Sequence, residues 1–363
     1  MHFFLEFCVI RNENRAIQMI KINHRHSVFL LLFASSFFFC GCINSYDNYT
    51  RFAGEAQGGT YNITCRLPDT SDIKAVEASI DSLLKAVDMS ISGYNKGSIL
   101  SRVNDNQDIP LDDIFVETFT ISKRIYDISG GAFDPSAAPL FDIWGFGFSQ
   151  DTTATKMKVD SVLSFVGMEK VSLAKYDDGT IHLKKEDSRI KLNFNAIAQG
   201  FTCDLLAGIL KREGCKDYII ELGGEIVCAG ESPRKGTWRV WIDKPVDGNN
   251  ASGELKQDIL NITDCGLVTS GNYRKFYVKD GEKYSHTIDP FTGYPVTHTL
   301  LSATVSAQDG ATADAYATWL MVVGLDAAKE IAQKMGFEAY LVYGEQDDMK
   351  VWHTPNLKLD SEN

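Results

Sequence analysis

The fold of this chain is decided by the stretch Tyr284-Ser285-His286-Thr287-Ile288-Asp289-Pro290-Phe291-Thr292-Gly293-Tyr294-Pro295-Val296, which is followed by Thr312-Ala313-Asp314-Ala315-Tyr316-Ala317-Thr318. In the first stretch, Asp289-Pro290 starts a turn, Thr292-Gly293 closes it, and Pro295 keeps the exit extended. His286 stands just before this rigid turn, so the backbone can fix its position.

The second stretch predicts the start of a helix. Asp314 and Thr318 are four residues apart, so both side-chain oxygens can lie on one helical face. A carboxylate and a hydroxyl directed at one spot suit a hard cation such as Mg²⁺. Taken alone, each stretch also fits a structural role, with Asp314 as a first-turn acid and His286 as a satisfied turn residue. Their occurrence together favours a functional site.

Composition and charge limit the class of protein. The chain has 363 residues, 44% of them hydrophobic, which is enough for one large domain or two ordinary ones. Its formal net charge of −12, without a run of Lys or Arg, argues against a nucleic-acid partner. An acidic protein that handles a phosphorylated ligand needs a metal ion or backbone N–H groups to hold it.

The N-terminus predicts a targeting segment rather than part of the fold. Basic residues precede the apolar run 28–39, which is too short to span a bilayer comfortably. The run leads to Gly41-Cys42, a junction that resembles a bacterial lipoprotein signal with Cys42 as the lipidated residue. Met19 is an alternative start of translation, because acidic residues lie before it. The competing interpretation is an uncleaved signal anchor.

These features predict a domain organisation. We expect a lipoprotein signal segment over residues 1–41, a polar tether over 42–55, a folded domain over 56–350 and a C-terminal tail over 351–363. The anchor would hold the protein at a bacterial cell membrane, on the periplasmic or extracytoplasmic side. The five cysteines after the leader form no CxxC pair, so we expect buried apolar residues and no zinc site: Cys65, Cys203, Cys215, Cys228 and Cys265.

Strands and helices alternate along the chain without the regular spacing of βαβ units. Apolar residues at helical spacing predict helices over 71–87 and 112–128, and a strand at 190–193 leads into a helix near Gly200. The remaining strands are predicted over 58–65, 217–229 with a break at Gly223-Gly224, 238–242 and 339–343. This mixture predicts an α+β fold, with mixed or antiparallel sheets flanked by helices.

A loop with the sequence Gly131-Ala132-Phe133-Asp134-Pro135 follows the second predicted helix. Its glycine lets the backbone approach a ligand closely, and the proline holds Asp134 extended. The alternative is a loop with a structural role only, which the packing of its aromatic residues holds in place. The turn at 194–200, between a strand and a helix, is likewise a weak candidate for a phosphate site.

Together these motifs resemble those of the ApbE family, the FAD:protein FMN transferases. The match covers nearly all of residues 55–345, and the His-Thr-Ile-Asp-Pro turn followed by Thr-Ala-Asp is its most specific part. The resemblance implies an architecture related to the T-fold, with the active site in a central cleft. Besides the two stretches quoted first, the matching pieces are Gly58-Gly59-Thr60-Tyr61, residues 90–101, Gly131-Ala132-Phe133-Asp134-Pro135, residues 193–201, Glu221-Leu222-Gly223-Gly224 and Thr269-Ser270-Gly271-Asn272-Tyr273.

The resemblance also implies a reaction. FAD is cleaved at its pyrophosphate, FMN passes to a threonine hydroxyl of a target protein as a phosphoester, and AMP leaves. Family targets include exported flavin subunits of the Na⁺-translocating NADH:quinone reductase and of related electron-transport complexes. Carried over by position, the implied site residues are His286 and Asp289 for catalysis, Asp314, Thr318 and the carbonyls of Ala196 and Ala317 for Mg²⁺, and Gly58, Tyr94, Ala132, Phe133, Asp134, Asn193, Gln199 and Ile288 for FAD.

The chain departs from the family pattern at three positions. The family commonly has aspartate where Asn193 stands, lysine where Gln199 stands and tyrosine where Phe201 stands. Asn193 and Gln199 keep hydrogen-bonding capacity but lose charge. Two other functions stay open: an FAD pyrophosphatase that uses water as the nucleophile, and a non-catalytic flavin-binding lipoprotein. The retained acidic and hydroxyl residues argue against the second.

Overall fold

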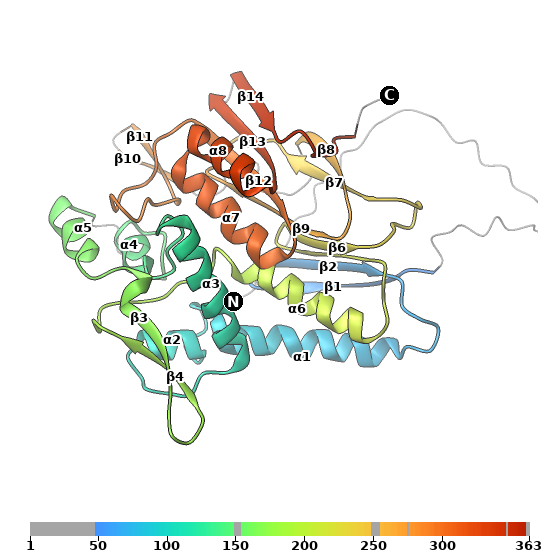
Figure 1. Ribbon diagram of the computed structural model, residues 1–363, viewed down its shortest axis with the longest axis horizontal. Coiled ribbons are helices and arrows are strands. Elements are labelled where there is room, and N and C mark those ends of the chain that lie inside the picture. Colours follow the sequence, from blue (N-terminus) through green and yellow to red (C-terminus); the bar gives the residue numbers. More distant parts are fainter. Residues whose placement is uncertain are drawn as a thin grey trace, which may run out of the picture. The chain divides into compact units, whose positions relative to one another are not determined.

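An eight-stranded sheet forms the centre of the computed structural model, which describes residues 48–148, 154–247, 255–273, 276–279, 281–345 and 348–360 (Figure 1). Neighbouring strands are antiparallel throughout. The predicted α+β class is therefore confirmed. In spatial order the strands are β1 (Thr50–Ala56), β2 (Gly59–Cys65), β5 (Tyr218–Leu222), β6 (Glu225–Ala229), β9 (Cys265–Gly271), β12 (Leu300–Ala307), β13 (Glu338–Glu345) and β14 (Asp348–His353).

The first hairpin starts earlier than the sequence suggests. Gln57 and Gly58 have φ angles of 51° and 76°, and two successive positive φ angles make the tight turn that matches strand twist. Phe52 is buried and pairs with Ile63 across the hairpin. The tether predicted over residues 42–55 is thus wrong from Thr50 onward, because one buried aromatic residue and a tight turn suffice for an edge strand.

Helices cover one face of the sheet (Figure 1). Two of them lie against it directly: α6 (Ala198–Arg212) over β5 and β6, and α7 (Gly310–Val323) over β9 and β12. Around this pair, α1 (Ile73–Ile91) packs on α6, while α3 (Asp113–Ser129) and α8 (Leu325–Met335) pack on α7. The helices predicted over 71–87 and 112–128 are confirmed as α1 and α3.

The opposite face of the sheet packs against a separate hairpin of β7 (Trp238–Asp243) and β8 (Lys256–Ile262). Ile226, Leu267 and Tyr340 point to this side, whereas their neighbours along each strand point to the helices. The last described residues run along β8, where the Asp360 N–H donates to the Ile259 carbonyl at 2.8 Å. The predicted tail is therefore wrong for 351–353, which belong to β14, and for the residues that pack on β8.

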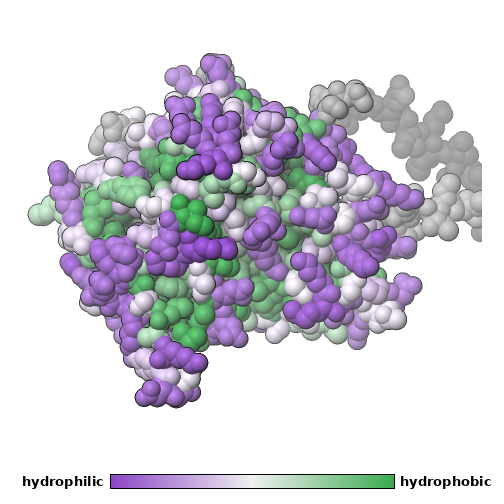
Figure 2. Space-filling model, viewed as in Figure 1, coloured by the Kyte–Doolittle hydropathy of each residue, from purple (hydrophilic) through white to green (hydrophobic). Residues whose placement is uncertain are grey.

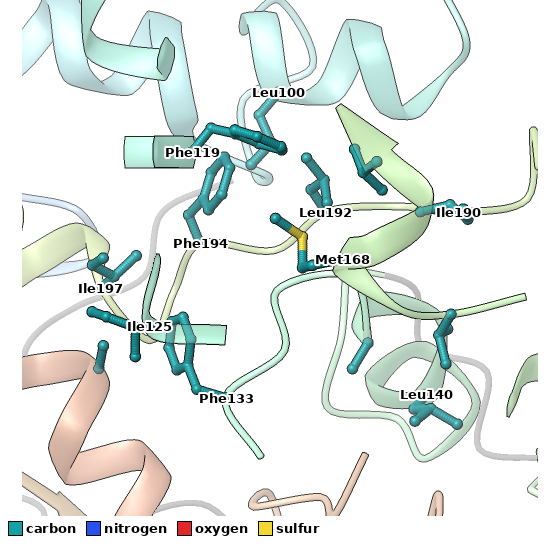
Figure 3. Packing of buried hydrophobic residues seen from close by; sticks show 14 of the residues in the cluster. Leu100, Phe119, Ile125, Phe133, Leu140, Met168, Ile190, Leu192, Phe194 and Ile197 are labelled. Atoms are coloured by element: carbon teal, nitrogen blue, oxygen red, sulfur yellow. The ribbon is translucent and has the colours of Figure 1, made fainter. Parts of the chain in front are cut away.

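A second core lies beside the sheet, where the helices α1, α3, α6 and α7 meet short elements and loops. Figure 3 shows Leu100, Phe119, Leu192 and Phe194 converging in it, with Phe133 close to Ile125 and Ile197. The packed loops carry the residues predicted for the site. The short elements of the fold are α2 (Ile99–Asn104), α4 (Ala138–Ile143), α5 (Lys156–Leu163), the 3₁₀ turn η1 (Met168–Lys170), β3 (Val171–Lys175), β4 (Ile181–Lys185), β10 (Phe276–Lys279) and β11 (Glu282–Ser285).

The strand predicted at residues 190–193 is wrong. Asn104 takes the place of a neighbouring strand, because its carboxamide accepts from the Leu192 N–H and donates to the Leu192 carbonyl, both at 2.8 Å. The Asn193 N–H donates to the Pro135 carbonyl at 2.8 Å. A buried extended segment thus satisfies its backbone without joining a sheet, and this brings Asn193 beside the loop of Asp134.

Figure 2 shows polar residues spread over the helical face, with apolar residues reaching the surface in smaller patches. Within the described ranges, no helix combines the length and the apolar character needed to cross a membrane. The predicted signal segment and Cys42 lie outside the described residues.

Candidate active site

A cavity of about 400 Å³ opens where the loops at one end of the sheet meet α6 and α7. It gathers residues that are far apart in the sequence, and most of those predicted for the site line it. Asp289 and Ala317 are not among its lining residues. The predicted residues that do line it are Gly58, Tyr94, Ala132, Phe133, Asp134, Asn193, Ala196, Gln199, His286, Ile288, Asp314 and Thr318.

Asp314 is the buried acid of the cavity. Its side chain is on α7, it is 4% exposed, and it accepts from the Gly200 N–H at 3.2 Å. Burial raises the pKa of Asp314 to about 7, the Gly200 N–H opposes that rise, and the Asp204 carboxylate adds to it. Thr318 lies one turn further along α7, and its hydroxyl is 3.3 Å from that of Ser270 on β9. The predicted common helical face is therefore confirmed.

Glycines let α6, α7 and β9 approach closely beneath Asp314. A Cβ added to Gly200 would lie 2.2 Å from the Gly310 carbonyl oxygen and 2.9 Å from the Asp314 Cβ. A Cβ added to Gly266 would lie 2.4 Å from the Asp309 carbonyl oxygen. All three distances are shorter than a real Cβ atom allows, so only glycine permits this contact.

Asp204 ties the start of α7 to α6. Its two carboxylate oxygens accept from the N–H groups of Gly310 and Ala311, at 2.7 and 2.8 Å. Asp309 caps the same helix by accepting from the Thr312 N–H at 2.7 Å. Burial raises the pKa of Asp204 to about 6, although the two N–H donors oppose the rise. Two acids therefore hold the helix that carries Asp314.

His286 lines the same cavity, and the predicted turn fixes it. The Asp289 N–H donates to the Tyr294 carbonyl at 2.9 Å, and the Gly293 N–H donates to the Asp289 carbonyl at 2.8 Å. The imidazole of His286 meets the Phe146 ring edge to face, with centroids 6.4 Å apart. The backbone thus places a titratable group at the cavity wall.

Asp289 lies within the predicted turn and is not among the residues that line the cavity. Its carboxylate accepts from the Phe291 N–H at 2.8 Å and from the Thr292 hydroxyl at 3.0 Å, so it stabilises the turn from within. Because it does not line the cavity, we assign it a role in positioning His286. Ala317 is fully buried inside α7 and is likewise set back from the cavity.

Asp134 contributes a second carboxylate, which is partly buried. It accepts from the Ser136 hydroxyl at 2.6 Å and from the Ser136 N–H at 2.8 Å. Burial raises the pKa of Asp134 to about 6, and the two bonds from Ser136 oppose the rise. The Gly167 N–H donates to the same Ser136 hydroxyl at 2.7 Å, which anchors the loop to the second core.

Two hairpin turns meet at the other end of the cavity. A Cβ added to Gly59 would lie 3.4 Å from the Gly223 Cα, and one added to Gly223 would lie 2.2 Å from the Gln199 Nε2. Gln199 therefore packs directly on a glycine turn. Tyr94 is 63% exposed at the rim, and its hydroxyl accepts from the Asn195 Nδ2 at 3.2 Å.

Several residues that line the cavity were not predicted from the sequence. Asn195, Glu225, Ser270 and Phe146 all line the cavity. A signal existed for three of them: Asn195 lies two residues from Asn193, Glu225 directly follows the double glycine, and Ser270 belongs to a matching motif. Phe146 gave none, because only the fold brings it to His286.

Known proteins with similar sequences belong to the family that the motifs resemble. The model of the ApbE family matches residues 58–341. The chain belongs to the ApbE family. It is 31% identical to the FAD:protein FMN transferase of Escherichia coli K12 over 339 residues, which are 90% of this chain and 95% of that protein. It is also 31% identical to the Vibrio cholerae protein of the same name over 336 residues, 91% of this chain and 97% of that protein.

Solved structures of ApbE proteins share the fold. The flavin transferase ApbE from Vibrio cholerae aligns with a TM-score of 0.73 at 29% identity, covering 85% of this chain and 97% of that one. The apo form of the flavinyl transferase ApbE from Pseudomonas stutzeri aligns with a TM-score of 0.74 at 28% identity, covering 85% and 95%. The expected ApbE-like architecture is therefore confirmed.

Proposed function

We propose that this chain is an FAD:protein FMN transferase. In the proposed reaction, a threonine oxygen of a target protein attacks the phosphorus on the FMN side of the FAD pyrophosphate. A new phosphoester bond joins FMN to the threonine, the bond to the AMP phosphate breaks, and AMP leaves. The threonine proton passes to a base, so atoms and charge balance without an oxidant or reductant.

One observation carries this proposal: a single cavity joins the buried acid of α7 to His286 and to the loops of Tyr94 and Asp134. A dinucleotide needs such an extended site, with separate places for its two ring systems and its diphosphate. The names of the relatives, which are about 30% identical over most of both chains, support the same reaction.

The residues present fit the Mg²⁺ ion that the family resemblance implies. Asp314 and Thr318 supply a carboxylate and a hydroxyl, both hard oxygen donors, and the raised pKa of Asp314 marks a buried charge that a cation would offset. The described residues contain no group of three or more His, Cys, Asp and Glu side chains that could hold a metal. That suits Mg²⁺, which proteins bind through one or two carboxylates together with substrate phosphates and water.

Asp314, Thr318 and the Ala196 carbonyl would hold the ion, which would neutralise the diphosphate. The Ala317 carbonyl, predicted as a further ligand, lies behind this wall and is a weaker candidate. His286 would accept the proton of the threonine hydroxyl, since an imidazole titrates near neutral pH. Asp289 would keep His286 in place through its turn.

The loops of the cavity would bind the rest of FAD. Tyr94 offers an exposed ring at the rim, and Gly58, Ala132 and Phe133 offer close backbone approach. Asn193, Gln199 and the Ile288 backbone add neutral hydrogen-bonding groups. The neutral side chains at 193 and 199 make the metal the main source of charge complementarity for the diphosphate.

The target and the location belong to the same proposal. We propose that the acceptor is an exported flavin subunit of the Na⁺-translocating NADH:quinone reductase type or of a related electron-transport complex. The predicted lipoprotein signal supports this, because it would anchor the enzyme through Cys42 at the extracytoplasmic side of the membrane, where such subunits are exposed.

Incubation of the protein with FAD, Mg²⁺ and a candidate flavin subunit tests the proposal, with intact mass as the readout. A transferase adds one FMN less one water to the subunit and releases one AMP. An FAD pyrophosphatase would instead give free FMN and AMP at the same rate with or without the subunit. A non-catalytic flavin binder would give no AMP.

A further inference from the structure

Four of the five described cysteines lie in two pairs, and the fifth stands apart. All five are thiols in the structure, and only Cys265 is more than marginally exposed. The paired residues are distant in the sequence, so chain neighbourhood does not explain the arrangement. Cys203 is fully buried in α6, where its Sγ lies 3.6 Å from the Glu225 carbonyl oxygen.

Cys228 and Cys265 are directly opposite each other on β6 and β9. Opposed residues of antiparallel strands have Cα atoms about 4.5–5.5 Å apart, within the roughly 4.4–6.8 Å that a disulfide requires. They form the last register pair between these strands. Both line a second cavity of about 420 Å³, and Cys265 is partly exposed. The Cys228 thiol lowers the pKa of Cys265, while burial acts against that lowering.

Cys65 and Cys215 meet in the interior between β2 and the loop before β5. The Arg66 N–H donates to the Asp217 carbonyl at 2.8 Å, and the Cys215 thiol donates to the same carbonyl at 3.4 Å. This shared acceptor places the Cys215 sulfur beside the end of β2, where Cys65 is the last residue. A hydrogen bond with the Cys215 thiol, together with burial, raises the pKa of Cys65, so the two side chains interact.

We propose that these cysteines form two disulfides, Cys65–Cys215 and Cys228–Cys265, and that Cys203 remains a thiol. The pairing accounts for the odd number of cysteines after the leader. It also fits an exported chain, because disulfides persist in oxidising compartments. The first bridge would fasten β2 to β5. The second would fasten β6 to β9 one residue from Gly266, on which the start of α7 packs.

Each bridge forms by thiol–disulfide exchange with an external disulfide such as oxidised glutathione. A cysteine thiolate attacks one glutathione sulfur, and one glutathione thiol leaves. The partner cysteine then attacks the mixed disulfide and displaces the second glutathione. Two cysteine thiols lose two protons and two electrons, and the external disulfide becomes two thiols.

Peptide mapping tests the pairing directly. The full chain is reduced, unfolded and refolded with reduced and oxidised glutathione, and free thiols are then blocked with N-ethylmaleimide in denaturant. Cleavage after Lys and Arg puts each of the five described cysteines on its own peptide, apart from those of the leader: 52–66, 192–211, 213–216, 217–234 and 257–274. We expect 52–66 linked to 213–216, 217–234 linked to 257–274, and 192–211 carrying the blocking group. Full blocking of either pair, or any other linkage, would overturn the assignment.

A second measurement separates the two sites. Oxidised glutathione added to the folded, reduced protein should link Cys228 to Cys265 before it reacts with Cys65 and Cys215, which N-ethylmaleimide should then still block. We expect this order because Cys228 and Cys265 line a cavity and Cys265 is the most exposed of the five described cysteines. Cys203→Ala should leave both linkages unchanged. Cys228→Ala should leave Cys265 blockable and lower the Tm of the oxidised protein by several degrees, with no such difference in reductant. Equal Tm values of oxidised wild type and this variant would contradict a bridge there.

Discussion

Asp314 is buried against an N–H group and near a second acid, which is an unfavourable place for a carboxylate unless a cation joins it. His286 lines the same cavity and is held by the backbone hydrogen bonds of its turn. The two residues therefore have separable roles: Asp314 for the ion, and His286 for the proton. Removing Asp314 should therefore affect Mg²⁺ binding, whereas removing His286 should affect the rate of FMN transfer.

Asp314→Asn should abolish Mg²⁺-dependent turnover and weaken Mg²⁺ binding, because the amide keeps the shape of the side chain but removes its charge. The fold should survive, since the substitution also removes a buried charge. Calorimetric titration with Mg²⁺ and turnover with FAD measure both effects. Asp326→Asn, an exposed acid in the first turn of α8, is the matched control and should behave as wild type. Equal turnover of the wild type in EDTA and in Mg²⁺ would rule out the ion.

His286→Ala should keep FAD affinity within a few-fold but slow FMN transfer by roughly 10²-fold or more, as expected when a positioned general base is removed. FAD binding depends on the metal and on the loops of Tyr94 and Asp134, so it changes little. Fluorescence titration with FAD and single-turnover transfer separate the two quantities. Transfer at the wild-type rate would reduce His286 to a turn residue and direct attention to Asp134, whose pKa burial raises to about 6.

At the scale of elements, the close contact of α6 with α7 positions the site. Gly200 allows that contact, and Gly208 is a control in the same helix, because its added Cβ would meet only the end of the flexible Arg212 side chain at 3.5 Å. Gly200→Ala should destabilise the fold by about 2 kcal/mol or more through overpacking and should weaken Mg²⁺ binding. Gly208→Ala should stabilise by about 0.5–1 kcal/mol through helix propensity. Denaturant unfolding measures both, and similar effects of the two substitutions would contradict the close contact.

The Asp204 clamp predicts a pH dependence of stability. Its folded-state pKa of about 6 lies above the ordinary value of 3.8. At a pH between these two values, Asp204 is protonated in the folded chain but ionised in the unfolded chain. The stability from Asp204 is therefore complete below about pH 4 and declines as the pH rises through about 6. Relative to Asp204→Asn, the wild type should lose on the order of 2 kcal/mol of unfolding free energy over this range. A constant difference from pH 4 to 7 would show that Asp204 is not buried as described.

How far the sequence predicts these elements depends on how local their causes are. The periodic helices α1 and α3 and the turn at Asp289 follow from neighbouring residues, and all were predicted. The segment at 190–193 was predicted as a strand of a sheet instead, because the side chain that satisfies its backbone belongs to Asn104, 88 residues away. Phe146 was not predicted as a lining residue for the same reason, because it is distant from His286 in the sequence. Asp314 and Thr318 were predicted because they are one helical turn apart.

At the scale of the whole molecule, the predicted lipid anchor is a separate claim. The apolar run and the Gly41-Cys42 junction predict that Cys42 is the first residue of a lipidated mature chain. Cys42→Ala should release the protein from membranes or leave its leader uncleaved, which fractionation and intact mass distinguish from wild type. A variant that remains membrane-bound with the wild-type N-terminus would contradict the lipoprotein interpretation and favour another anchor.

The central claim is that FAD binds in one cavity with its diphosphate at Asp314, and that FMN is transferred there to a protein hydroxyl near His286. The most direct test is the intact mass of a candidate flavin subunit after incubation with the protein, FAD and Mg²⁺, with AMP measured in the same sample. We predict one added FMN less one water per subunit and one AMP released, both lost in Asp314→Asn. AMP and free FMN formed without any change in the mass of the subunit would contradict transfer and identify a pyrophosphatase.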